Sequence, residues 1–124
     1  MRRKNEVIET AYQLEYANPT NVEVGSVMVN EKYNGSYKFY IVTKVTKCYV
    51  HFKPIGRNRE LIKEDEYSRT YIVSPNIDQV ENEIMKRKVT TTHNNKVALN
   101  YIDSLDDSRL RVYTRPMRYV SSPW

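Results

Sequence analysis

The stretch that decides the fold runs from Val24 to Gly56 and reads 24-VGSVMVNEKYNGSYKFYIVTKVTKCYVHFKPIG-56. It holds three runs rich in β-branched and aromatic residues, at 24–29, 39–45 and 48–55, with polar residues between them. Such runs, bounded by Gly, Asn and Ser, are typical of short β-strands. The Asn34-Gly35 step favours a turn, since this pair readily takes positive φ. We therefore predict three consecutive strands of a small, curved β-sheet.

A turn centred on Thr46-Lys47 gives the second and third strands a definite register, with Tyr40 opposite Lys53 and Val42 opposite His51. Cross-strand partners share a face of a sheet. One predicted face is apolar and belongs in the core: Phe39, Ile41, Thr43, Val45, Cys48, Val50 and Phe52. The other is basic and aromatic, and we expect it to be exposed or partly covered: Tyr40, Val42, Lys44, Tyr49, His51 and Lys53.

The flanking segments predict a mixture of strands, loops and helix. Residues 1–17 carry apolar residues at helical spacing, and Pro19 disfavours continuation of that helix. Residues 56–60 are expected to be a polar loop. Residues 78–88 begin acidic and end basic, which suits a helix dipole; a strand continuing from Lys88 is the competing interpretation. Residues 70–73, 97–102 and 110–113 are expected to be further strands.

The chain of 124 residues is expected to form a single domain, residues 1–124. Its parts are an N-terminal helix at 1–17, a β-barrel core at 22–113 and a C-terminal tail at 114–124. The predicted fold class is mainly β (α+β), a small curved barrel of about five to seven strands with the N-terminal helix and, in one interpretation, a helix near residue 80.

Positive charge is concentrated in two blocks. The net charge is +5, yet residues 63–85 carry six acidic and two basic residues. Residues 21–62 carry seven Lys or Arg against three acids, and residues 86–124 carry eight against three. Two basic blocks that meet in the fold would form a positive face that attracts phosphate. The alternative is a mixed, solvated surface.

The residue inventory argues against several functional classes. One Cys excludes an internal disulfide and fits a reducing compartment. No apolar run reaches the ~18 residues of a membrane span, and the N-terminus lacks the apolar region of a secretory signal. Cys48 and His51, three apart in a strand, point to opposite faces, and two His with one Cys do not make a zinc site. We expect no enzyme, cofactor, metal, small-molecule substrate or membrane partner, and no secretion.

Three short motifs occur in order along the chain: Val24-Gly25-Ser26-Val27 with Phe39-Tyr40-Ile41-Val42, then Lys86-Arg87-Lys88-Val89, then Arg115-Pro116-Met117-Arg118-Tyr119. Together they resemble a group of small uncharacterised proteins encoded by bacteriophages and mobile elements. That group carries Trp-Gly-Tyr-Asp-Gln-Thr-Asn in the loop where this chain has residues 31–37. The resemblance implies an SH3-like or related small barrel of viral or mobile-element origin, located in the host cytoplasm or the virion. It implies no known activity.

The first functional hypothesis is a non-enzymatic viral or mobile-element accessory module that contacts nucleic acid with low sequence specificity. Cations neutralise phosphates, and planar rings beside them stack on bases. The residues predicted to do so are Tyr40, Lys44, Tyr49, His51, Lys53, Arg57, Arg59, Lys86, Arg87 and Lys88. The structural alternative is that these are ordinary residues of a half-exposed strand, and that residues 86–88 complement a helix dipole.

The second hypothesis is a protein-interaction module, either a virion component or an antagonist of a host factor. Small barrels use loops and exposed strand edges to bind partners. The residues predicted to form that contact lie in the loop at 31–37 and in the C-terminal tail: Tyr33, Tyr37, Tyr113, Arg115, Tyr119 and Trp124.

Overall fold

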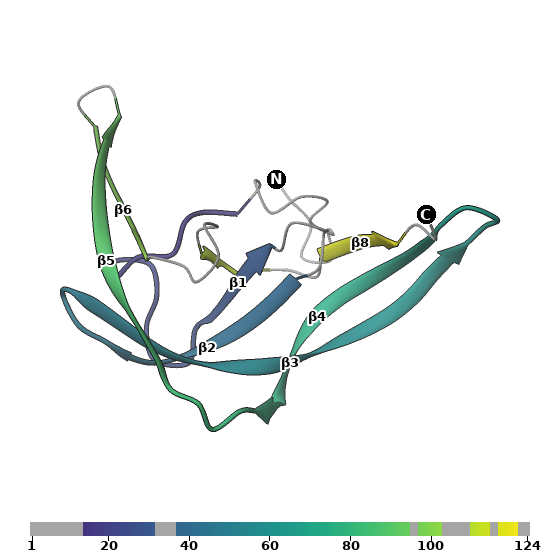
Figure 1. The fold of residues 1–124 in the computed structure, drawn as a ribbon, viewed down its shortest axis with the longest axis horizontal. Helices are drawn as coiled ribbons and strands as arrows, with labels where there is room; N and C mark the ends of the chain where they lie inside the picture. The colour runs from purple at the N-terminus through teal and green to yellow at the C-terminus, as the bar shows by residue number, and fades with distance from the viewer. Residues whose placement is uncertain (1–13, 32–36, 95–96, 103–109, 115–116, 122–124) are drawn as a thin grey trace.

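A computed structural model describes residues 14–31, 37–94, 97–102, 110–114 and 117–121. Within these ranges the chain forms eight β-strands and no helix, so the fold is mainly β as the sequence predicts (Figure 1). The strands are β1 (Val27–Glu31), β2 (Tyr37–Val45), β3 (Tyr49–Glu64), β4 (Arg69–Val80), β5 (Met85–Asn94), β6 (Val97–Ile102), β7 (Arg111–Val112) and β8 (Met117–Ser121).

All strand pairings are antiparallel, and β3 is the strand on which the others are organised. Six strands follow the order β6-β5-β3-β2-β1-β7, while β4 pairs with β3 and β8. The first part of β3 lies between β2 and β5, and its second part continues with β4 as a long hairpin. In Figure 1 this hairpin and the β5–β6 hairpin project in different directions from the centre around β1 and β2.

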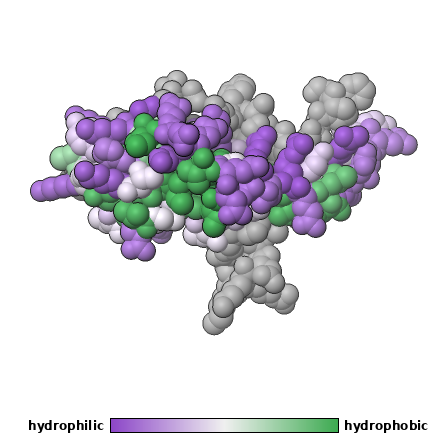
Figure 2. Space-filling model, turned by 90° about the horizontal axis from the view of Figure 1, so that it is seen from below, coloured by the Kyte–Doolittle hydropathy of each residue, from purple (hydrophilic) through white to green (hydrophobic). Residues whose placement is uncertain are grey.

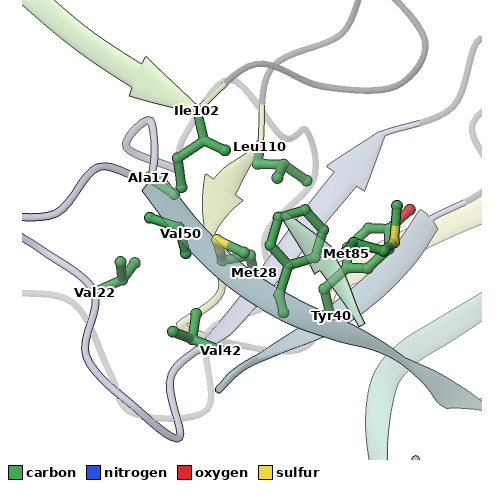
Figure 3. Close-up of a cluster of buried hydrophobic side chains, with 10 residues drawn as sticks. Ala17, Val22, Met28, Tyr40, Val42, Val50, Met85, Ile102 and Leu110 are labelled. Atoms are coloured by element: carbon green, nitrogen blue, oxygen red, sulfur yellow. The ribbon is translucent and has the colours of Figure 1, made fainter. Parts of the chain in front are cut away.

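The centre of the sheet is covered by apolar residues on both faces. Tyr40 pairs with Met28, and its neighbour Phe39 pairs with Val29. Because successive side chains of a strand point to opposite faces, these two pairs lie on opposite sides, and all four residues are buried. Cluster 1, on one side, comprises Ala17, Val22, Met28, Tyr40, Val42, Val50, Phe52, Met85, Ile102 and Leu110 (Figure 3). Cluster 2, on the other, comprises Leu14, Val29, Tyr37, Phe39, Ile55 and Val73.

The register between β2 and β3 differs from the predicted one because β2 contains a bulge. The structure pairs Lys44 with His51 and Val42 with Phe52, so Thr43 is an extra residue in the ladder. An extra residue inverts the inward–outward alternation of the strand beyond it. Lys44 therefore keeps its predicted face, whereas Tyr40 and Val42, predicted on the outer face, are buried in cluster 1.

The turn between β2 and β3 places Cys48 differently from the sequence prediction. Its backbone closes at the Thr46 N–H, which donates to the Tyr49 carbonyl at 2.9 Å, and the Tyr49 N–H donates to Thr46 Oγ1 at 2.9 Å. Cys48 lies within this four-residue turn and is exposed, so its predicted place in the core is wrong.

The helix considered for residues 78–88 is replaced by the end of β4, a connection at 81–84 and the start of β5. The competing interpretation, a strand through Lys88, is confirmed. The predicted N-terminal helix falls largely on residues 1–13, outside the described residues; within the described part, Tyr16 forms a β-bridge with Arg111 instead. The predicted tail contains β8, which pairs with β4.

Candidate nucleic-acid interface

Three strands bring basic residues from both positive blocks onto one surface. Lys44 of β2 lies opposite His51 of β3, which lies opposite Lys86 of β5. Tyr49 of β3 lies opposite Lys88 in the same way. Since partners and alternate residues share a face, six residues lie together there. We call this set the basic face: Lys44, Tyr49, His51, Lys53, Lys86 and Lys88.

The reverse side of the same strands fixes this orientation. Val50 and Phe52, which alternate with the basic-face residues of β3, are 0% and 1% exposed in cluster 1. Met85, the β5 partner of Phe52, is buried with them. Rotating the strands to turn the lysines inward would expose this apolar surface, so packing of cluster 1 holds the basic residues outward.

The basic face is small, and three of its lysines are open to solvent. Neighbouring strands lie about 4.8 Å apart and alternate residues about 6.6 Å apart, so the face measures about 10 Å by about 13 Å. Lys44, Lys86 and Lys88 are exposed. Among the described residues, the ion pair in the structure joins Glu64 to Arg69 at the far tip of the β3–β4 hairpin and does not involve these lysines. The positive potential of the basic face is therefore directed to solvent.

An aromatic ring and a cation are in contact on this face. The Lys86 ammonium nitrogen lies 4.2 Å from the centroid of the Tyr49 ring. A cation–π contact of an exposed pair contributes about 0.5–1 kcal/mol. Tyr49 remains 37% exposed, so the ring is accessible beside the ammonium group. A planar group and a phosphate of one nucleotide strand could be bound by this pair together.

Three of the predicted cations do not join the basic face. Arg57 and Arg59 lie six and eight residues beyond His51 on β3, about 20 Å and about 26 Å along the strand. Arg57 donates from Nη1 to the Tyr37 carbonyl at 3.1 Å, and the Arg59 guanidinium lies 4.7 Å from the Tyr71 ring centroid. Arg87 alternates with Lys86 and Lys88 on β5 and points to the other side.

Tyr40, predicted to stack on a base, is instead a core residue. It is 2% exposed, and its ring meets Phe52 edge-on at a centroid distance of 5.2 Å. The bulge at Thr43 is the physical reason, because it turns this part of β2 over relative to β3.

Lys47 is a basic residue that the sequence argument did not include. It lies in the turn between β2 and β3, next to the basic face, and is exposed. The sequence places Lys47 at the centre of the predicted turn. Strand alternation assigns a face only to residues within strands, so it could not assign Lys47 to the basic face.

Of the residues predicted to bind a protein partner, the structure describes the surroundings of Tyr37 and Tyr113, and both pack against the core. Tyr37 is buried in cluster 2, and Tyr113 packs edge-on against Phe39 at 5.5 Å between ring centroids. Burial also raises the pKa of the Tyr113 hydroxyl. Tyr119 belongs to β8 through its backbone pairing, while Tyr33, Arg115 and Trp124 lie outside the described residues. Tyr37 is thus a core residue, and Tyr113 is a half-buried residue that packs against the core.

Comparison of the chain with protein-family models, with curated proteins and with solved structures finds no match in any of the three. In the part of the chain that the structure describes, no three His, Cys, Asp or Glu side chains gather in a group able to hold a metal ion. The same residues include no helix with the length and apolar character needed to cross a membrane.

Proposed function

We propose that the chain is a non-enzymatic module that contacts nucleic acid with low sequence specificity through the basic face. The observation that carries this proposal is the convergence of β2, β3 and β5, which unites lysines from both basic blocks of the sequence on one open surface. We also propose a viral or mobile-element origin, and an SH3-like barrel as the finer description of the β-rich fold. Both rest on the sequence resemblance.

The chemistry of the basic face favours backbone contacts over reading of base edges. Lysine ammonium groups act as point charges on flexible stems and bind phosphate without fixing its orientation. The Asn, Gln and Arg side chains that read base edges by bidentate hydrogen bonds are not among its six residues. Tyr49 can stack on any base, since every base has a π-face. Binding is therefore expected to be tolerant of sequence and to favour single strands.

The salt dependence of binding gives a quantitative expectation. Lys44, Lys53, Lys86 and Lys88 can each neutralise one phosphate. Each contact contributes about −0.7 to the slope of log K against log salt for single strands, so the expected slope is about −2.8. For double-stranded DNA the same count gives about −3.6.

The test measures fluorescence anisotropy of labelled single- and double-stranded DNA and RNA over a salt series. Lys86→Gln with Lys88→Gln should weaken binding and reduce the single-strand slope by about 1.4. Lys38→Gln is the matched control, because Lys38 is exposed on β2 but six residues from Lys44 and outside the basic face. Tyr49→Leu should weaken single-strand binding more than duplex binding. An unchanged slope in the double variant, or no binding at low salt, would overturn the proposal.

A further inference from the structure

The second half of β3 has one edge that no described strand covers. One edge of this half, at residues 57–64, pairs with β4, and β4 in turn pairs with β8. On the other edge, pairing with β2 ends where Phe39 meets Ile55. Figure 1 shows this part of β3 as the outermost strand of the long hairpin. An open edge presents unpaired N–H and C=O groups and can accept a strand from another chain.

The residues along this edge are complementary to themselves in the antiparallel direction. The strand segment reads 57-RNRELIKE-64. With Leu61 opposite Ile62 of a second copy, Glu60 faces Lys63 and Arg59 faces Glu64. Each of these opposite-charge pairs would occur twice. Placing Leu61 opposite itself would instead bring Arg59 against Lys63, a repulsive pair of like charges.

The bulge in β3 makes the complementary register compatible with two-fold symmetry. A two-fold axis normal to a sheet keeps each residue on the same face in both copies, so partners 61 and 62 must share a face. In a regular strand they would not. In β3, however, Leu61 pairs with Tyr71 and Lys63 with Thr70, leaving Ile62 as an extra residue. The alternation is therefore reset between residues 61 and 63, and residues 59, 61 and 64 lie on one face while 60 and 63 lie on the other.

The side chains at the centre of this edge are apolar and open to solvent. Leu61 is 47% exposed and Ile62 is 48% exposed. Seen from below the view of Figure 1, hydrophobic side chains lie among hydrophilic ones along the hairpin (Figure 2). In the self-complementary register, Leu61 of each copy would cover Ile62 of the other and remove apolar surface from water.

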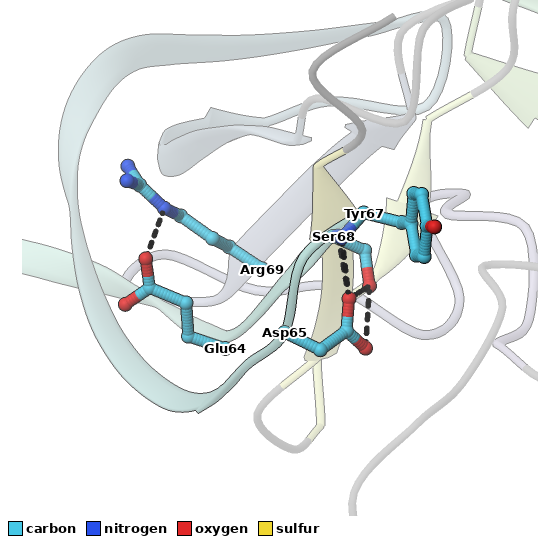
Figure 4. Close-up of polar contacts among 5 residues, drawn as sticks. All are labelled: Glu64, Asp65, Tyr67, Ser68 and Arg69. Atoms are coloured by element: carbon cyan, nitrogen blue, oxygen red, sulfur yellow. Dashed lines mark hydrogen bonds and ion pairs between the residues drawn. The ribbon is translucent and has the colours of Figure 1, made fainter.

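The ionic groups at the end of the segment remain available to a second copy. The Glu64 carboxylate binds Arg69 Nε at 3.1 Å, and the Arg69 and Glu64 side chains are still 59% and 52% exposed (Figure 4). A carboxylate offers about four lone-pair sites, so Glu64 can accept a second cation from the Arg59 of another chain. Asp65 accepts hydrogen bonds from the Tyr67 and Ser68 N–H groups and so belongs to the hairpin turn that follows the edge.

We propose that two copies of this chain associate through β3, antiparallel and with Leu61 opposite Ile62, so that the two β3–β4 hairpins form one continuous intermolecular sheet. The association is isologous, since the same segment serves both partners. It is independent of the nucleic-acid proposal, because the basic face lies at the other end of β3.

The test is sedimentation velocity of the full chain over a wide concentration range. Glu60→Lys replaces each Glu60–Lys63 attraction by a repulsion between two lysines, twice in the dimer, and should raise the dissociation constant about tenfold. Adding Lys63→Glu to Glu60→Lys exchanges the two charges and should restore the dissociation constant to within about threefold of the original. Glu83→Lys is the control, because Glu83 is exposed and lies in the connection before β5, away from the edge.

A protein that stays monomeric at the highest concentration would overturn the proposal, and it would leave the edge to a partner of different sequence. A dimer that Glu60→Lys and the charge exchange affect alike would also overturn it. Hydrogen exchange provides a second measurement on the unmodified chain: amides at 59–63 should gain protection as concentration rises. Unchanged exchange in a dimeric sample would place the interface elsewhere.

Discussion

The contact between Tyr40 and Phe52 distinguishes the observed register of β2 and β3 from the one predicted by strand alternation. In the structure both rings lie on the same side of the sheet, 5.2 Å apart and inclined by 74°. In the predicted register they lie on opposite faces and do not touch. A double-mutant cycle with Tyr40→Leu and Phe52→Leu measures this difference directly.

The expected coupling free energy is about 1 kcal/mol, since edge-on aromatic pairs contribute about 0.5–1.5 kcal/mol beyond the apolar area that they bury. The losses that each substitution causes alone, including the cavity and any lost hydrogen bond of the Tyr40 hydroxyl, cancel in the cycle if they are independent. Equilibrium unfolding in urea supplies the four free energies of unfolding, and an unchanged m-value in each variant shows that the two-state analysis holds.

Two further double-mutant cycles serve as a positive and a negative control. Phe39 and Tyr113 meet edge-on at 5.5 Å in cluster 2, so their coupling should also be about 1 kcal/mol. Phe52 and Tyr113 lie on opposite sides of the sheet and should couple by less than about 0.5 kcal/mol. A Tyr40–Phe52 coupling below about 0.3 kcal/mol would refute the bulge at Thr43 and return Tyr40 to the outer surface.

Two further predictions concern the β3–β4 hairpin. A Cβ atom on Gly56 would lie 2.1 Å from Gln79 Oε1 and 2.8 Å from Gln79 Cβ. Gly56→Ala should therefore lower the free energy of unfolding in urea by about 1–3 kcal/mol. In a Gln79→Gly background both Gln79 atoms are absent, so the same substitution should cause little of this loss. The Asp65 carboxylate accepts hydrogen bonds from the Tyr67 and Ser68 N–H groups at 2.8 Å each, which lower its pKa below the ordinary value. Its stabilisation of the turn is therefore present above the unfolded pKa and lost as pH falls through the folded one. The protection factors of the Tyr67 and Ser68 amides, taken relative to the intrinsic exchange rate at each pH, should fall with acidification. An Asp65→Asn variant that kept the same acid sensitivity would contradict this cause.

The sequence predicts the strands well where residue preference and alternation agree. β1, β2 and the first half of β3 coincide with the β-branched and aromatic runs at 24–55. The second half of β3 begins in the segment expected to be a polar loop, because residues 57–60 lack the apolar alternation of a half-buried strand. That half of the strand is exposed and held by pairing with β4, so its conformation depends on a partner that periodicity does not reveal.

In the segment at 78–88, the local sequence preference favours a helix, whereas tertiary contacts favour a strand. Its early acids and late bases match a helix dipole, a weak local preference of about 0.3–1 kcal/mol per charge. The structure instead inserts Met85 into cluster 1 and pairs residues 85–88 with β3. Burial of Met85 contributes about 1.5–3 kcal/mol, and each backbone hydrogen bond to β3 adds about 0.5–1.5 kcal/mol. Together these tertiary contacts outweigh the summed dipole term, and the strand forms.

The candidate site is predictable only as far as the alternation of side chains is regular. The β3 part of the basic face, Tyr49, His51 and Lys53, follows from simple alternation and keeps its predicted place. On β2 the prediction is right at Lys44 and wrong at Tyr40, because the bulge at Thr43 lies between them. A bulge is a tertiary compromise between two strands, and the composition of β2 carries no residue, such as Gly, that would mark its position.

The bulges at Thr43 and Ile62 both determine which side chains lie on the surfaces proposed to bind other molecules. The bulge at Thr43 lets β2 turn Tyr40 toward cluster 1 while Lys44 remains on the basic face. In the proposed dimer, the extra residue Ile62 allows Leu61 and Ile62 to lie on one side of the edge of β3, where a regular strand would point one of them away. His51 and Leu61 are ten residues apart on β3, or about 33 Å, so the two surfaces do not overlap. A dimer joined at Leu61 and Ile62 would therefore leave both basic faces free, at the two ends of the shared sheet.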